Sequence, residues 1–282
     1  MKLLRFGDAG HEKPGLMDAE GNIRDLSAHI NEIDGEFLSS DDFAKVRDLN
    51  PESLPRVTGN PRIAGPVSRV GKFICVGLNY ADHARESGME VPPEPVLFMK
   101  ATSAISGPFD QVELPPRSEK SDWEVELGVV IGKEAKYVSE AEAMDYVAGF
   151  CLINDLSERE FQIEKQGQWM KGKGCDTFGP TGPYLVTPEE VGDFNNLSIW
   201  LELNGERVQN GNTNTMVYKV PFLVHYISQF MSLQPGDIIS TGTPPGVGLG
   251  MNPPKYLKEG DVMRLGIDNL GEQRQEVVRY SK

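Results

Sequence analysis

The sequence predicts a mixed, mainly β protein that has few short helices and a small α+β domain at its N-terminus. Short apolar runs separated by Gly, Pro, Asn and Asp recur from Lys72 onward, which is typical of strands joined by turns. The chain has 282 residues, enough for one large domain with an appendage. We therefore expect a small N-terminal domain over residues 1–68 and a β-rich domain over residues 69–282.

The first 68 residues carry the signals of the smaller domain. A turn at Glu20-Gly21-Asn22 separates two short apolar runs, which favours a pair of strands. A polar stretch of helix and loop follows. Prolines then interrupt the chain, so we expect the connection into the second domain to contain Pro51, Pro55 and Pro61.

The second domain contains the clearest single elements. Asn204-Gly205 lies between two apolar runs and supplies the positive φ angles of a type I′ hairpin turn. Residues 221–231 begin with proline and place apolar residues at helical spacing, so we expect a mostly buried helix there. Strands are expected at residues 73–78, 123–131 and 146–153.

The charge and composition of the chain limit its partners. The formal net charge is −14, which repels phosphate backbones and anionic lipid surfaces, so we expect no nucleic-acid or membrane partner. No apolar stretch approaches the roughly 18 residues of a membrane span, and no signal-peptide pattern opens the chain. The cysteines Cys75, Cys151 and Cys175 form no C-x-x-C pair, and we therefore expect a cytoplasmic protein.

Several catalytic motifs are absent from the sequence. It contains no H-E-x-x-H, no G-x-S-x-G and no cysteine pattern typical of zinc sites. Residues 167–174 nearly match a phosphate-binding P-loop, but Gly174 stands where a Ser or Thr must bind Mg²⁺.

Three acids alternate with apolar residues at the start of one predicted strand. Period-two alternation places Asp122, Glu124 and Glu126 on the same face, and a solvated outer face is the simpler interpretation. Two observations favour a metal site. The same face continues into Gly128 and Val130, as a pocket wall would, and a bound cation would remove the repulsion among the acids. Carboxylates without His or Cys favour Mg²⁺, Mn²⁺ or Ca²⁺.

Further candidate residues precede and follow this strand. Asp155 ends a long apolar run and is a third ligand candidate, although an Asp at a strand end is often only a turn residue. Arg159 and Gln162 are three residues apart and would share one face of a helix. His83 and Glu86 have the same spacing, at which a carboxylate can orient an imidazole as a general base. An ordinary surface pair is the alternative for these two residues.

These candidates belong to a series of segments whose order is specific. The segments are Val76-Gly-Leu-Asn-Tyr80-Ala-Asp-His83-Ala-x-Glu86, Phe98-Met-Lys100, Glu124-x-Glu126-Leu-x-x-Val-Ile-Gly132, Asn154-Asp155-x-Ser-x-Arg159-x-x-Gln162, Trp169-x-x-x-Lys173-x-x-Asp176-Thr177-Phe-x-Pro-x-Gly-Pro183, Asn212-Thr and Thr241-Gly-Thr243-Pro-x-Gly-Val-Gly248. Together they cover about residues 72–250, most of the chain. In this order they resemble the fumarylacetoacetate hydrolase family.

The resemblance implies a fold, a cofactor and a set of residue roles. The fold would be the β-rich roll of the family, commonly paired as a homodimer. The cofactor would be Mg²⁺ or Mn²⁺. The site residues implied are Glu124, Glu126 and Asp155 as metal ligands, His83 and Glu86 as a water-activating pair on a segment that orders over substrate, Lys173 as a catalytic contact to substrate oxygens, and Arg159, Gln162 and Thr243 as substrate-binding residues.

The resemblance also implies a small 2-oxo acid as the substrate. We expect a metal-dependent hydrolase that cleaves a carbon–carbon bond in a 2,4-diketo acid, either an acylpyruvate or a 2,4-diketo-3-deoxy sugar acid. A lyase or decarboxylase of the oxaloacetate decarboxylase or ureidoglycolate lyase type is the alternative, because the same cation would stabilise an enolate in either reaction. A non-catalytic metal-binding module is the third interpretation.

Overall fold

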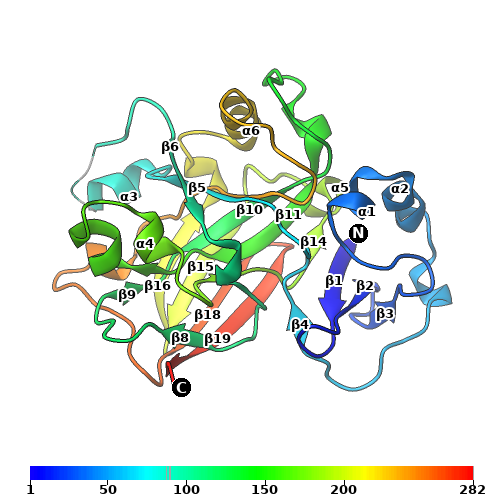
Figure 1. Ribbon diagram of the computed structural model, residues 1–282, viewed down its shortest axis with the longest axis horizontal. Helices are drawn as coiled ribbons and strands as arrows, with labels where there is room; N and C mark the ends of the chain where they lie inside the picture. Colours follow the sequence, from blue (N-terminus) through cyan, green and yellow to red (C-terminus); the bar gives the residue numbers. More distant parts are fainter. Residues whose placement is uncertain (87, 89, 282) are drawn as a thin grey trace.

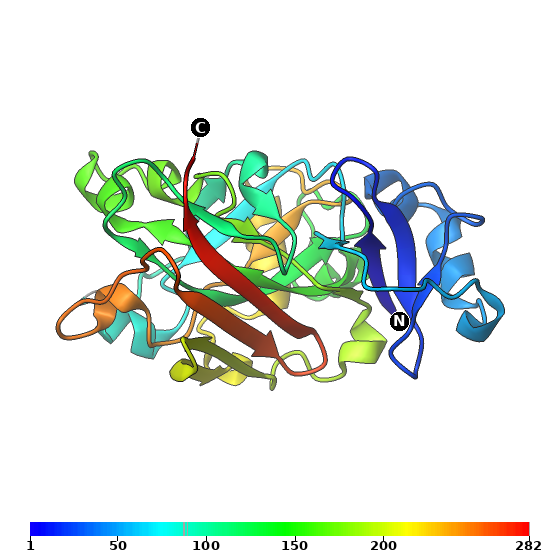
Figure 2. The same cartoon turned by 90° about the horizontal axis from the view of Figure 1, so that it is seen from below.

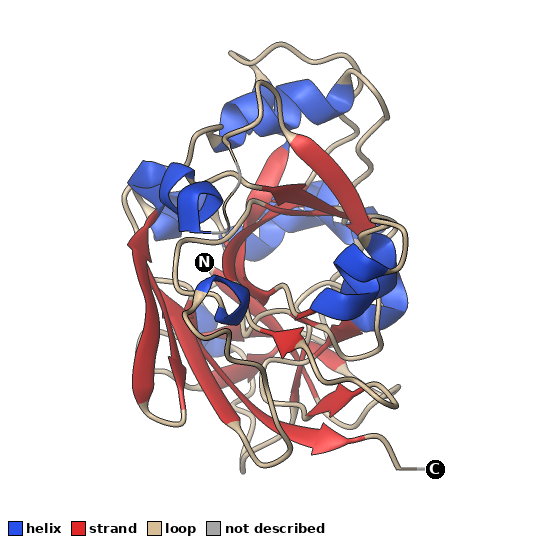
Figure 3. Cartoon of the chain, turned by 90° about the vertical axis from the view of Figure 1, so that its left-hand side faces the viewer, coloured by secondary structure: helices blue, strands red, loops and turns tan. Residues whose placement is uncertain are grey.

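A computed structural model describes residues 1–86, 88 and 90–281. The chain is mainly β, as the sequence predicts, and its short helices lie around the strand framework (Figures 1 and 3). No helix in these ranges is long and apolar enough to cross a lipid bilayer. The helices and helical turns are α1 (Gly35–Ser39), α2 (Asp41–Arg47), η1 (Pro51–Ser53), α3 (Ala81–Glu86), η2 (Thr102–Ala104), η3 (Ala143–Tyr146), η4 (Glu160–Glu164), α4 (Met170–Lys173), α5 (Pro188–Val191), η5 (Thr213–Thr215), α6 (Val220–Ser228) and η6 (Gly248–Gly250).

The larger sheet has ten strands in the order β3-β2-β1-β14-β11-β10-β17-β5-β6, with β4 paired to β1. Its middle strands β10 and β11 are antiparallel partners, and β17 joins β10 to the parallel strand β5. The strands are β1 (Lys2–Phe6), β2 (Lys13–Met17), β3 (Ile23–Asp25), β4 (Ile63–Ala64), β5 (Phe73–Gly77), β6 (Val96–Lys100), β10 (Val125–Ile131), β11 (Val147–Asn154), β14 (Leu185–Val186) and β17 (Ile238–Ser240).

A second sheet of five strands packs against the larger one, and its order is β16-β15-β18-β19-β8 (Figure 2). Two short pairs, β9 with β12 and β7 with β13, complete the strand pairing. The strands are β7 (Ile105–Ser106), β8 (Val112–Leu114), β9 (Ser121–Asp122), β12 (Ser157–Glu158), β13 (Gly179–Pro180), β15 (Ser198–Leu203), β16 (Glu206–Asn212), β18 (Val262–Ile267) and β19 (Gly271–Arg279).

The alternation of side chains along β10 separates the main core from the candidate site. Val125, Leu127 and Val129 are buried in the core that the two sheets share. The intervening positions, including Glu126 and Val130, point to the opposite face of the sheet, as period-two geometry requires. A single strand therefore carries both the core contacts and the polar site.

The N-terminal residues form a small α+β unit at one edge of the larger sheet (Figure 1). Strand β1 pairs with β14, so the sheet of this unit is continuous with the sheet that carries the candidate site. Phe37 and Leu38 of α1 belong to a hydrophobic cluster that also contains Phe73 and Cys75 of β5. The division of the chain into residues 1–68 and 69–282 stays a prediction.

The clearest expected elements occur where the sequence places them. β5 and β10 lie within their predicted ranges, and β11 extends one residue beyond its predicted range, to Asn154. Asn204 and Gly205 have φ angles of 54° and 84°, which confirms the type I′ turn of the β15–β16 hairpin. Helix α6 ends at Ser228, earlier than predicted. A turn follows at residues 229–230, and Leu233 then forms an antiparallel bridge with Ala135.

We expect the strand that carries the site to be sensitive to lost core contacts. Val129→Ala removes two buried carbon atoms from a side chain that is 1% exposed, which should lower the free energy of unfolding by roughly 1–3 kcal/mol. The matched control is Val217→Ala, whose side chain is 38% exposed and should change stability by less than about 0.5 kcal/mol. Urea denaturation midpoints measure both, and equal midpoints would contradict this account of the core.

Candidate metal and active site

Three buried carboxylates lie together at one end of the β10–β11 pair. Glu124 immediately precedes β10, Glu126 is the second residue of this strand, and Asp155 follows the last residue of β11. The register pairs Val125 with Asn154, and the backbone nitrogen of Asp155 donates to the Glu124 carbonyl at 2.8 Å. Each acid offers an oxygen that lies within 4.8 Å of the other two. All three are buried, so the alternative of a solvated outer face is wrong.

The Glu126 carboxylate is held by neutral donors. Its Oε2 accepts hydrogen bonds from Ser240 Oγ at 2.6 Å and from the backbone nitrogen of Gly242 at 2.8 Å. Burial, together with the charges of Asp155 and Glu124, raises the pKa of Glu126 well above its usual value. A divalent cation would compensate this charge, and carboxylate oxygens are preferred ligands of Mg²⁺ and Mn²⁺. The donor set therefore fits such an ion.

Two buried lysines hold the other two carboxylates. Lys173 Nζ, from α4, lies 2.7 Å from Glu124 Oε2 and 2.8 Å from Asp155 Oδ2. Lys100, the last residue of β6, donates to Asp155 Oδ1 at 2.6 Å and to the Leu156 carbonyl at 2.9 Å. Burial opposes the charged form of Lys173, but Asp155 and Glu124 raise its pKa above the usual value. Lys173 therefore remains a fixed positive charge beside the acids.

Arg159 connects the acids to the next polar segment. Its guanidinium donates to Asp122 at 2.8 Å, to Glu124 at 2.7 Å and to Gln162 Oε1 at 3.0 Å. Arg159 and Gln162 share one face of the segment, as their spacing predicts. Asp122 also accepts from the backbone nitrogen of Gly248 at 2.7 Å and lies outside the cluster of three acids. The strict alternation predicted from Asp122 to Glu126 is interrupted because β9 ends at Asp122 and β10 starts at Val125.

His83 and Glu86 are neighbours on α3, but they are not hydrogen-bonded. His83 Nδ1 lies 3.6 Å from Glu86 Oε2, beyond hydrogen-bond length. Within the described ranges, this buried nitrogen has no hydrogen-bond partner. The Glu86 carboxylate instead accepts from the backbone nitrogen of Gly246, at 2.9 Å for the nearer oxygen. The expected pair is thus brought together without the bond that would orient the imidazole. The segment expected to order over substrate includes Ser87 and Met89, which lie outside the described residues.

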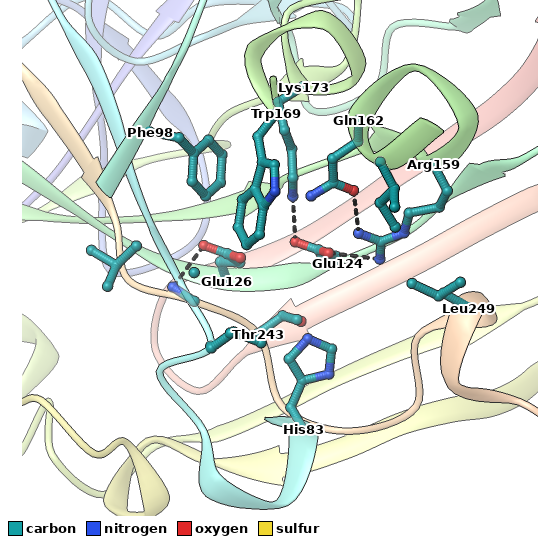
Figure 4. A pocket seen from close by; sticks show the side chains of 15 residues that line it. His83, Phe98, Glu124, Glu126, Arg159, Gln162, Trp169, Lys173, Thr243 and Leu249 are labelled. Atoms are coloured by element: carbon teal, nitrogen blue, oxygen red, sulfur yellow. Dashed lines mark hydrogen bonds and ion pairs between the residues drawn. The ribbon is translucent and has the colours of Figure 1, made fainter. Parts of the chain in front are cut away.

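These side chains line a cavity of about 170 Å³ (Figure 4). His83 points into it from one side, and Trp169 stands on the other (Figure 4). Asp155 does not line the cavity, because Lys173 and Lys100 cover its two oxygens. The polar lining residues are His83, Glu124, Glu126, Arg159, Gln162, Lys173 and Thr243, so the cavity brings together seven of the nine predicted site residues.

Thr243 lines the cavity, but its hydroxyl group is already hydrogen-bonded within the protein. Its Oγ1 donates to the Val125 carbonyl at 2.9 Å and accepts from Gln209 Nε2 at 2.8 Å. The single hydroxyl proton is therefore already committed to the backbone of β10.

Several site residues were not assigned roles from the sequence. Lys100 holds a predicted metal ligand, and Phe98 and Trp169 form part of the cavity wall. Trp169 precedes Lys173 by four residues, one helical turn, so a helix over this segment indicates that both lie on one face. No comparable local signal joins Lys100 to Asp155, which follows it by 55 residues.

A glycine allows α4 to approach the π-helical turn η4 closely. A Cβ atom at Gly172 would lie 2.2 Å from the Glu158 carbonyl oxygen and 2.6 Å from the Gln162 backbone nitrogen. Any larger residue would push the two segments apart. Gly172 therefore brings Lys173 and Gln162 to the same cavity.

Comparisons with known proteins identify relatives of the whole chain. The family profile described as "Fumarylacetoacetate (FAA) hydrolase C-terminal" matches residues 72–278. A protein of Burkholderia multivorans, whose name suggests a hydrolase and states no substrate, is 61% identical over 276 residues, which are 98% of each chain.

Solved structures of related enzymes share the fold. Fumarylacetoacetate hydrolase from Exiguobacterium antarcticum is 34% identical, with a TM-score of 0.88 over 99% of this chain and 100% of that chain. Maleylpyruvate hydrolase from Sphingobium sp. SYK-6, solved with manganese(II) and pyruvate, is 30% identical with a TM-score of 0.83, and both chains are fully covered. The 2-hydroxyhepta-2,4-diene-1,7-dioate isomerase of Mycobacterium marinum is 31% identical with a TM-score of 0.76, again over both full chains.

Replacing Glu126 should separate metal binding from folding. Glu126→Gln removes a candidate ligand charge and should weaken Mn²⁺ binding at least about tenfold, measured by calorimetry. The same change removes a buried carboxyl group whose charged form is unfavourable without a cation, so the metal-free variant should melt at the same temperature as the unmodified protein or higher. Glu272→Gln, at an exposed position, is the control and should leave Mn²⁺ affinity unchanged. Equal Mn²⁺ affinity in Glu126→Gln and the unmodified protein would rule out the ligand assignment.

Proposed function

The chain belongs to the fumarylacetoacetate hydrolase family, and we propose that it is a Mg²⁺- or Mn²⁺-dependent hydrolase that cleaves a carbon–carbon bond in a small 2,4-diketo acid. The substrate class comprises acylpyruvates and 2,4-diketo-3-deoxy sugar acids. The observation that carries the proposal is the cavity in which His83 and Lys173 face the buried carboxylates. The similarity to a maleylpyruvate hydrolase supports it.

Glu124, Glu126 and Asp155 would hold the divalent ion. When bound, such an ion supplies Lewis-acid polarisation of a carbonyl oxygen. The remaining roles belong to side chains of the chain itself. Gln162 accepts from Arg159 through Oε1, so its amide nitrogen is left to donate to the 2-oxo acid end of the substrate.

His83 would act as the general base of hydrolysis. Its Nε2 would take a proton from a water molecule that attacks the distal carbonyl carbon, because Nδ1 is the ring nitrogen that faces Glu86. The bond between that carbon and the neighbouring methylene carbon then breaks, and its electron pair remains on the pyruvate part as an enolate. The Lys173 ammonium provides fixed positive charge for this enolate. Protonation of the enolate carbon yields a pyruvate-type product and a carboxylic acid. Glu86 would orient the imidazole once the 3.6 Å gap closes.

A reaction without water is the second candidate. The similarity to the Mycobacterium marinum isomerase and the absence of a His83–Glu86 hydrogen bond in the described residues favour enolate chemistry alone, as in isomerisation, decarboxylation or a ureidoglycolate lyase type of reaction. A non-catalytic metal-binding module would have no need of His83 and Lys173 at one cavity. We also propose a cytoplasmic location, for which the widely spaced cysteines speak, and a homodimer, as the initial resemblance implies.

The His83→Ala variant distinguishes hydrolysis from the alternative. It should lower kcat for an acylpyruvate by about 10²–10⁴, the loss typical of a general base, because no other group would activate the water. Mn²⁺ affinity should stay unchanged. The assay uses acylpyruvates, a 2,4-diketo-3-deoxy sugar acid, oxaloacetate and ureidoglycolate with Mg²⁺, and NMR identifies the products.

The control is His11→Ala, which changes an exposed histidine of the N-terminal unit and should leave all rates unchanged. Rapid turnover of oxaloacetate or ureidoglycolate alone, equal in the His83→Ala variant and the unmodified enzyme, would refute hydrolysis as the natural reaction.

A further inference from the structure

We propose that the aromatic pair Phe98 and Trp169 limits the length of the substrate's distal group, and that this group is short, apolar and uncharged. The inference rests on the proposed function, because it assumes that the 2-oxo acid end of the substrate lies at the carboxylates. It goes further by assigning the chemistry of the other end, and within the proposed substrate class it selects acylpyruvates over the hydroxylated 2,4-diketo-3-deoxy sugar acids.

The cavity offers no free cation to a second carboxylate. Within the described residues, Arg159 and Lys173 are the only basic side chains besides His83 that line it. The guanidinium of Arg159 is engaged by Asp122, Glu124 and Gln162. The Lys173 ammonium bridges two carboxylates. A terminal carboxylate would therefore lose its hydration without gaining a fixed partner, which is costly in a buried site.

The walls around the carboxylates are apolar. Val76, Leu78, Phe98, Ile163, Trp169 and Leu249 line the cavity beside the polar residues. A substrate anchored at the acids must therefore place its distal end among hydrocarbon and aromatic surfaces. Burial of an apolar group there is favourable by about 0.8 kcal/mol per CH₂, which corresponds to a three- to fourfold gain in affinity for each added carbon.

Phe98 and Trp169 are the part of the wall that has space behind it. Their rings contact each other edge to face, with centroids 5.3 Å apart and planes at 63°. The same two side chains line a second cavity of about 590 Å³, together with Val96, Met99 and Met170. The aromatic pair thus lies between the candidate active site and a more open groove, whose lining also includes the polar residues Gln168 and Lys171.

Two contacts fix the position of the aromatic pair. A Cβ atom at Gly77 would lie 2.6 Å from the Trp169 ring, so the indole packs directly on the backbone at the end of β5. The Phe98 ring has the Lys173 ammonium 5.1 Å from its centroid, within cation–π range. A distal chain that outgrows the first cavity would therefore meet Trp169. Removing the indole would open the path into the groove.

The experiment measures binding of compounds that cannot be cleaved. Straight-chain 2-oxo acids from 2-oxobutanoate to 2-oxodecanoate lack the second carbonyl, and calorimetry in the presence of Mn²⁺ gives their affinities. In the unmodified protein we expect a three- to fourfold gain per carbon up to a short optimum, followed by a fall. In Trp169→Ala the optimum should move to a chain at least two carbons longer. 2-Oxoadipate should bind at least tenfold more weakly than 2-oxoheptanoate.

Met170→Ala is the matched control, because this exposed neighbour lines only the groove and should leave the optimum of the unmodified protein in place. Trp169→Leu serves as a milder variant should Trp169→Ala fail to fold, and it should give a smaller shift in the same direction. An optimum that stays fixed in both Trp169 variants, or tight binding of 2-oxoadipate, overturns this proposal alone. If no 2-oxo acid binds the unmodified protein, the proposed function fails and this proposal fails with it.

Discussion

The burial of four carboxylates among three basic side chains is the constraint on which the site depends. An isolated buried charge costs several kcal/mol, so each charged group in such a cluster needs a partner. The basic residues pair with three of the acids, whereas Glu126 has only neutral hydrogen-bond donors. The position of the uncompensated charge is therefore the position at which a cation is most favourable. The members of the cluster are Asp122, Glu124, Glu126, Asp155, Lys100, Arg159 and Lys173.

The larger sheet fixes the relative positions of the charged groups in this cluster. The β10–β11 register sets Asp155 beside Glu124, and β6 delivers Lys100 from the far edge of the same sheet. The helical segments add Lys173 and Arg159 from one side. Because the pairs are bonded within 2.6–2.8 Å, small displacements of either layer would break several ion pairs at once. Activity should therefore depend on packing between the layers as well as on the acids.

Local patterns in the sequence predict the strands, the hairpin turn and the acidic face, because alternation and Asn-Gly chemistry act over a few residues. These local patterns do not predict contacts between residues that are distant in sequence. Glu86 accepts from Gly246, 160 residues further on, and this contact competes with the expected bond to His83. Phe98 and Trp169 come together only because β6 and α4 pack side by side. The approximate positions of the site residues could be predicted, whereas their hydrogen-bond partners could not.

The lysine that bridges Glu124 and Asp155 also has a consequence for the order of assembly. A site made of carboxylates alone would resist folding until a metal ion arrived, since the charges would repel one another. Here Lys173 and Lys100 neutralise the repulsion from within the chain. The chain itself therefore supplies the charges that folding requires, and loading of the proposed metal ion would be a late, reversible event. Fluctuating metal supply would then change the fraction of active molecules without changing the amount of folded protein.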